Sequence, residues 1–191
     1  MDSALAEFSR QGYGASSINT ICAAQNISKG IVYHYFETKD VLFLACVAEC
    51  FQRLTEYIRT NLVRQGDAEC CLEEYFAIRT KFFRSCPVYQ RIFCEAVISP
   101  PAHLRAEIQA CRQDFDTLNF QILEQLLVPL SLRPGISREE VIDTFRQFQD
   151  FINVRCQTAG GQEFEAREEN CRKALDILLY GVIKREGSSH V

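Results

Sequence analysis

The sequence predicts an all-α fold, with an N-terminal helix-turn-helix module of three helices followed by a larger helical remainder. Apolar residues recur at spacings of three and four, and no segment alternates as a half-buried strand would. Prolines and glycines gather in short breaks between these segments. The length of 191 residues and the hydrophobic content of 47% suit one compact unit or two small ones.

The segment from Ser16 to Lys39 predicts two short helices joined by a tight turn, then the start of a third. Ile18 and Ile21 give the first helix an apolar face, and Ser17 stands where a hydroxyl can cap it. Asn26 falls where the turn needs a left-handed residue, a conformation that asparagine tolerates better than most side chains.

The second helix of this segment is predicted over residues 29–36, with Ser28 as its cap. Val32 and Phe36 are four residues apart and are expected to pack inward. Thr38 caps the third helix, and Ile27 would fill the space under the turn. Helix, turn and helix in this order are typical of a motif that inserts its second helix into the major groove of DNA.

This segment resembles the DNA-binding domain of the tetracycline-repressor (TetR) family. The resemblance covers the first fifth to quarter of the chain, and the remainder resembles the family in being helical and of suitable length. We place the DNA-binding domain at residues 1–46 and a ligand-binding and dimerisation domain at residues 47–191. The positions that agree in type and spacing are Phe8, Gly12, Tyr13, Ser16, Ser17, Ile21, Ile27, Ser28, Lys29, Gly30, Tyr33, Phe36, Lys39 and Leu42.

The resemblance implies a set of DNA-contacting positions, with Lys29 and Gly30 nearest the base edges. Those positions are Ser17, Lys29, Gly30, Tyr33, His34, Tyr35 and Lys39. Cys22, Gln25 and Asn26 depart mildly from the family pattern and leave the fold in place.

The charge of this module sets its expected affinity. Residues 1–46 hold three basic and four acidic side chains, a net charge near −1. Strong nucleic-acid binders are basic, so we expect modest, salt-sensitive affinity. This balance and a thin first helix keep open the alternative of a helical small-molecule-binding protein that no longer binds DNA.

The remainder reads as further helices separated by clear breaks. Apolar periodicity predicts helices over about 38–62, 69–84, 88–98, 103–127 and 164–184, with another opening at Ser137 and ending at Gly160-Gly161. Ser137 and Glu140 have the spacing of a capping box. The resemblance implies a homodimer through the last two helices.

The middle helices are expected to enclose a pocket for a small hydrophobic or aromatic effector, again by resemblance. Its lining would come from Phe82, Phe83, Phe93, Phe115, Leu118, Phe148 and Phe151, each of which could instead be ordinary core. Four carboxylates lie among these segments and could orient a cationic group: Glu95, Asp114, Asp116 and Asp150.

The ten cysteines are scattered, without a Cys-x-x-Cys pair or neighbouring histidines. We interpret most of them as small apolar core residues, with Cys70 and Cys71 as the best candidates for redox chemistry. No metal or other cofactor is predicted.

The resemblance implies a transcription regulator, most simply a repressor that a ligand releases from a palindromic operator in double-stranded DNA; an activator is the alternative. The chain lacks phosphate loops, nucleophile elbows and metal-binding histidine pairs, so we expect no enzyme. It shows no secretory signal and no membrane-spanning stretch, which favours a cytoplasmic location.

Overall fold

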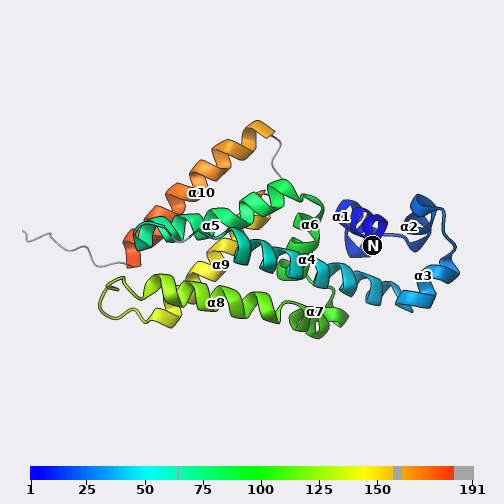
Figure 1. Cartoon of the computed structure of the whole chain (residues 1–191), viewed down its shortest axis with the longest axis horizontal. Helices are drawn as coiled ribbons and strands as arrows, with labels where there is room; N and C mark the ends of the chain where they lie inside the picture. The colour runs from blue at the N-terminus through cyan, green and yellow to red at the C-terminus, as the bar shows by residue number, and fades with distance from the viewer. Residues whose placement is uncertain (64, 157–160, 183–191) are drawn as a thin grey trace, which may run out of the picture. The chain divides into compact units, whose positions relative to one another are not determined.

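The computed structural model describes residues 1–63, 65–156 and 161–182, and helices are the only regular elements in those ranges. The all-α prediction is therefore confirmed. Figure 1 shows the helices in chain order: α1 (Asp2–Ala15), α2 (Ile18–Gln25), α3 (Lys29–Phe36), α4 (Lys39–Asn61), α5 (Ala68–Ser85), α6 (Val88–Ile98), the short 3-10 turn η1 (Ala102–Leu104), α7 (Arg105–Cys111), α8 (Gln113–Leu127), α9 (Arg138–Cys156) and α10 (Gly161–Val182).

The chain forms two compact units. Unit 1 comprises Met1–Asn61 and Arg79–Thr117, and unit 2 comprises Leu62–Ile78 and Leu118–Val191. The predicted domain boundary after residue 46 falls inside α4, which continues unbroken to Asn61, and that boundary stays a prediction. None of the described helices combines the length and the apolar character that crossing a membrane would require.

The caps and the turn of the N-terminal module follow local sequence. Asn26 adopts φ 53° and ψ 39°, the left-handed conformation predicted for the turn, and its N–H donates to the Ala23 carbonyl at 3.2 Å. The Ser28 hydroxyl accepts from the Ile31 N–H at 3.4 Å, and Thr38 accepts from the Val41 N–H at 3.2 Å. These bonds satisfy amides that a helix start leaves without partners.

Ser17 has the predicted position before α2, but the predicted capping hydrogen bond from its hydroxyl is wrong. Ser17 occupies the N-cap position of α2, but its side chain makes no capping hydrogen bond. Its N–H instead donates to the Glu7 carboxylate at 3.2 Å, so the start of α2 is fastened to α1. The inward packing is also partial: Val32 is buried, whereas Phe36 and Ile27 are only half-buried.

The core of unit 1 is a cluster of aromatic rings around α4. Phe51 lies 5.5 Å from Phe93 and 5.3 Å from Phe115, measured between ring centroids. Arg79 is only 1% exposed, and its guanidinium lies 4.6 Å from the centroid of Phe115. A cation over an aromatic face is attracted by the ring quadrupole, so the rings help to accommodate this buried charge.

The interior of unit 2 contains buried side-chain hydrogen bonds beside packed aromatic rings. The Tyr75 hydroxyl donates to Asn119 Oδ1 at 2.6 Å, and Gln149 Nε2 donates to the Tyr75 carbonyl at 3.2 Å. Phe76 packs edge-on against Phe145 at 5.6 Å between ring centroids. α9 also packs on α10 within this unit.

Two predicted helices have different limits in the structure. The helix expected over 103–127 divides into η1, α7 and α8, because the backbone departs from regular helix at Leu104 (φ −108°, ψ 7°) and at Arg112 (φ −96°, ψ −2°). Apolar spacing continues through the bend at Arg112, so the sequence does not reveal it. The last helix, expected from Phe164, begins at Gly161; Gly160 of the predicted break and residues 183–191 lie outside the described residues.

Most cysteines with a described environment behave as apolar core. Cys22, Cys46, Cys50, Cys71 and Cys94 are buried, and burial raises the pKa of the Cys46 thiol to about 12. Cys70 is exposed, and its hydrogen bond with Asp67 raises its thiol pKa. A raised pKa disfavours the reactive thiolate, which speaks against the redox role suggested for this residue.

Candidate nucleic-acid interface

The candidate interface is the exposed side of α3. Figure 1 shows α2 and α3 at one end of unit 1, farther out than α1. Val32 is the only fully buried residue of this helix. Ile31, Tyr33 and Tyr35 are 48%, 43% and 72% exposed, although each is large and apolar. Exposed apolar side chains that gather on one short helix indicate a contact surface.

The start of α3 leaves room for close approach. Lys29 and Gly30 are both exposed in its first turn. A Cβ placed on Gly30 would meet only the Ser28 hydroxyl, at 3.6 Å, which is an ordinary contact. The fold therefore does not require glycine here, and the open space beside it faces outward.

The aromatic residues at the other end of α3 form a small cluster. His34 and Tyr35 stack edge-on with their ring centroids 5.2 Å apart. All three of Tyr33, His34 and Tyr35 are exposed, so their polar atoms are accessible to phosphate oxygens.

Two of the residues predicted to contact DNA form interactions with other groups of the same chain. Ser17 is half-buried, with its N–H on Glu7. The Lys39 ammonium lies 3.5 Å from the Gly14 carbonyl oxygen and 4.7 Å from the centroid of the Tyr13 ring. The structure thus brings five of the seven predicted residues together on α3 and leaves these two beside it.

Sequence reasoning missed two carboxylates that organise this module. Glu7 is only 5% exposed; its hydrogen bond with Arg10, together with the Ser17 N–H, lowers its pKa below the usual 4.5. Glu95, on α6, accepts the Tyr13 N–H at 3.0 Å on both oxygens. Glu95 is 82 residues from Tyr13, so no local spacing signals this contact.

The residues predicted to line a ligand pocket are divided between the two units. In unit 1, Phe82, Phe83, Phe93 and Phe115 are buried and in ring contact, with centroids 5.2 Å apart for Phe82 and Phe83 and 5.1 Å for Phe83 and Phe93. In unit 2, Leu118 and Phe148 are half-buried, and Phe151 is 54% exposed.

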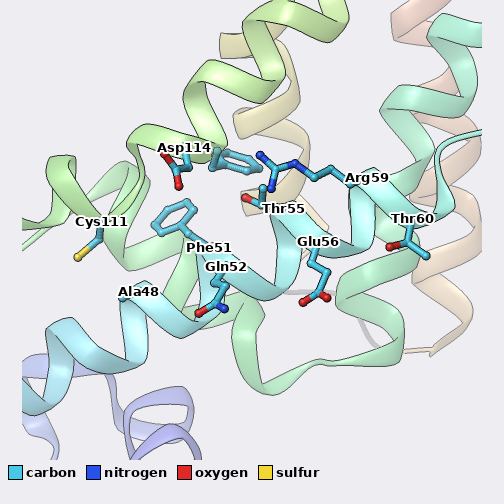
Figure 2. A pocket seen from close by; sticks show the side chains of 10 residues that line it. Ala48, Phe51, Gln52, Thr55, Glu56, Arg59, Thr60, Cys111 and Asp114 are labelled. Carbon is cyan, nitrogen blue, oxygen red and sulfur yellow. The ribbon is translucent and has the colours of Figure 1, made fainter.

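A groove of about 570 Å³ lies within unit 1, beside α4 and the segment from Cys111 to Phe115. Figure 2 shows the side chains that line it. Of the predicted ligand set, Phe115 alone is among these lining residues. The lining residues are Ala48, Phe51, Gln52, Thr55, Glu56, Arg59, Thr60, Cys111, Asp114 and Phe115.

The groove has an apolar base and a polar rim. Phe51 and Phe115 are 1% exposed and Thr55 is 5% exposed, so these three residues form the base. Asp114 and Arg59 are exposed and place charges at the rim. Such a site can hold an apolar or aromatic group beside a charged one.

The fold and the exposed helix together define a helix-turn-helix protein with a helical remainder. Residues 1–46 match the family model described as "Bacterial regulatory proteins, tetR family". The chain is 25% identical over 118 residues to the biofilm operon icaADBC HTH-type negative transcriptional regulator IcaR of Staphylococcus epidermidis. That alignment covers 61% of this chain and 61% of the relative, so the matched part spans under two thirds of the relative's length.

Solved structures extend the similarity to the whole fold. A TetR family transcriptional regulator from Chloroflexus aurantiacus matches with a TM-score of 0.73 and 21% identity, covering 96% of this chain and 91% of the other. FadR from Bacillus subtilis, solved in complex with stearoyl-CoA, matches with a TM-score of 0.74 and 15% identity, covering 94% and 96%. Residues 1–46 thus carry the sequence pattern of the TetR family, and the described fold is that of solved TetR-family structures.

Proposed function

We propose that this chain is a DNA-binding transcription regulator, most simply a repressor, that binds a palindromic operator as a homodimer and is released by a small-molecule effector. The observation that carries this proposal is α3, a helix held by the buried Val32 that exposes Tyr33 and Tyr35. A helix of this kind after a tight turn fits the major groove.

The chemistry of α3 supports particular roles. Gly30 gives the backbone close access to base edges, and Lys29 places a positive charge beside them. The Tyr33 and Tyr35 hydroxyls and the His34 ring can donate to phosphate oxygens. Lys39 would act mainly by holding the start of α4 against Gly14, which fixes the backbone next to the DNA.

Exposed apolar residues of α9 and α10 support the homodimer. Ile177 and Tyr180, three residues apart on α10, are 75% and 48% exposed, and Phe151 on α9 is 54% exposed. Large apolar side chains that are exposed close together on one surface are typical of a partner interface. A two-fold dimer presents two copies of α3 to two half-sites one helical turn apart.

The groove of unit 1 supports an effector, and the relatives support repression. IcaR is named a negative transcriptional regulator, and FadR of the same fold was solved with stearoyl-CoA. By analogy, a small hydrophobic or aromatic molecule would bind beside Phe51 and Phe115. Release requires that it bind the DNA-free conformation more tightly than the bound one. We propose a cytoplasmic location, because a regulator of this kind has to reach the DNA that it binds.

Selection of genome fragments by the purified protein, followed by titration of the enriched site, tests this proposal. An enriched inverted repeat, bound by a dimer, is the expected result. Tyr33→Ala should weaken binding about tenfold, because a phosphate contact is lost. Lys39→Ala should also weaken binding, without changing dimerisation. Lys81→Ala, an exposed lysine on α5, is the matched control.

A helical small-molecule carrier is the second candidate. It is favoured by the net charge near −1 of residues 1–46 and by the engagement of two of the three cations there, Arg10 with Glu7 at 2.8 Å and Lys39 with Gly14. A folded dimer that enriches no fragment would contradict the regulator and leave the carrier.

A further inference from the structure

The C-terminal end of α1 is held by polar groups from α6, an element outside the helix-turn-helix. Within α1 the helix breaks at Gly12, which adopts φ 77° and ψ 171°. A break of this kind leaves backbone groups on both sides without their helical partners. Side chains of α6 supply partners to both sides of this break.

Glu95 serves the amide that follows the break. The Tyr13 N–H donates to both carboxylate oxygens of Glu95 at 3.0 Å. A hydrogen bond to a charged acceptor is about twice as strong as one between neutral groups. This contact fixes the exit of α1 on α6.

Arg91, one turn earlier on α6, serves the carbonyls that precede the break. Its Nη1 donates to the Arg10 carbonyl at 3.0 Å, and its Nη2 donates to the Gln11 carbonyl at 3.3 Å. Together Arg91 and Glu95 pair two carbonyls and one amide of α1, those of Arg10, Gln11 and Tyr13.

The fit around Gly12 is close on both sides. A Cβ on Gly12 would stand 3.3 Å from Arg91 Nη2 and 3.3 Å from Glu95 Oε2, and its positive φ would strain any L side chain. The backbone of Gly12 therefore lies directly against both polar groups, which leaves little freedom for α1 to slide or tilt while the bonds persist.

A second contact acts on the same segment. His103 of η1 lies with Nε2 3.2 Å from the Tyr13 hydroxyl and 3.2 Å from Asp40 Oδ2. The Tyr13 hydroxyl also donates to Asp40, at the start of α4. Residues of α6 and η1, both distant in sequence, thus hold the segment from which α2 departs.

The path from this segment to the DNA-reading helix is short. α1 packs on α2 and α4, and α2 packs on α3. Glu7 of α1 also accepts the N–H of Ser17, the N-cap residue of α2. A shift of α1 on α6 would therefore move α3, while the internal structure of the helix-turn-helix is preserved.

From this geometry we infer that Glu95, with Arg91, is a positioning residue that sets the placement of α3 in the dimer by fixing α1 on α6; this inference rests on the proposed function. It predicts a specific defect. Loss of the Glu95 contact should impair recognition of the spacing between two half-sites and leave recognition of a single half-site intact.

The test compares Glu95→Ala, Glu95→Gln and the parent on three DNAs: the selected palindrome, the same palindrome with one base pair added between the half-sites, and one half-site. Glu49→Gln is the matched control, because Glu49 of α4 accepts the α6 Tyr89 hydroxyl at 2.9 Å and Arg53 Nε at 2.9 Å, two partners outside α1. Amide hydrogen exchange at Tyr13 and along α3 is measured in parallel.

Glu95→Ala should bind the palindrome about tenfold more weakly, since a charge-assisted hydrogen bond contributes on that scale. It should also lose the preference between the two spacings and bind the half-site as the parent does. Glu95→Gln keeps an acceptor oxygen, so its affinity for the palindrome should lie between those of the parent and of Glu95→Ala. Exchange should quicken at the Tyr13 amide and stay unchanged in α3. Glu49→Gln should match the parent on all three DNAs.

Equal weakening on palindrome and half-site would assign Glu95 a general structural role and overturn the inference. So would unchanged binding of all three DNAs by Glu95→Ala. If the parent itself enriches no DNA, the proposed function fails first, and the inference fails with it; the parent measurement separates the two failures.

Discussion

At the scale of single residues, the turn between α2 and α3 depends on Asn26. Its φ of 53° is a conformation that costs a residue with a Cβ about 1–2 kcal/mol, least for asparagine and nothing comparable for glycine. The exposed position of Asn26 means that this backbone preference, rather than packing, determines which residues suit the turn.

Asn26→Ala should therefore lower the free energy of unfolding by about 1 kcal/mol, and Asn26→Gly should leave it unchanged or raise it slightly. Urea unfolding followed by circular dichroism measures both. Asn19→Ala, at an exposed position inside α2, is the control and should cost nothing comparable. Equal stability of the two alanine variants would contradict the role given to Asn26.

Residue-scale prediction succeeded where the signal is local. The Asn26 turn and the Ser28 and Thr38 caps each join groups within about three residues, so type and spacing reveal them. The contacts of Glu7 with Ser17 and of Glu95 with Tyr13 could not be found in this way, because they join residues ten and 82 positions apart. A carboxylate in a sequence otherwise reads as solvated surface.

At the scale of elements, α9 begins with the predicted capping box. The Ser137 N–H donates to Glu140 Oε2 at 2.8 Å, and the Glu140 N–H donates to the Ser137 hydroxyl at 3.2 Å. The backbone hydrogen bond from Ser137 lowers the pKa of Glu140 below its usual 4.5. A lowered pKa in the folded state means that the charged carboxylate favours folding.

The contribution of Glu140 should be fully present above about pH 4.5 and should disappear as the pH falls through its lower folded pKa. Glu140→Gln should thus reduce stability at pH 7 and converge on the parent in acid. Thermal unfolding of both proteins from pH 7 to pH 3 measures this. Glu139→Gln, an exposed carboxylate of the same turn, is the control. A difference that persists at pH 3 would contradict the assignment.

The sequence predicted which segments are helical better than it predicted where some helices end or which of their residues line a groove. Apolar periodicity finds α4, α5 and α6 within about a turn, since burial of one face makes that pattern. It does not detect the bend at Arg112, where the stripe continues across the break. It also does not distinguish core from lining: of the seven expected pocket residues only Phe115 borders the groove, while Thr55 and Arg59 were not anticipated.

At the scale of the whole molecule, the proposed dimer requires a partner surface over the exposed apolar residues of α10. Ile177→Asp should shift the protein from dimer to monomer, because it places a charge where the proposed partner surface would exclude water. Sedimentation velocity over a range of concentrations measures this. Ile98→Asp, at the 54% exposed end of α6, should leave the dimer intact. A dimeric Ile177→Asp protein would contradict an interface at this position.

The buried thiols give each unit its own reporter of local opening. The chain has no tryptophan, but Cys46 lies in the core of unit 1 and Cys71 in unit 2. A thiol reagent reacts with a buried cysteine when the surrounding structure opens, so the rate of alkylation reports how often that opening occurs. Mass spectrometry of alkylated peptides would therefore time the opening of each unit separately, in the native protein and without an introduced label.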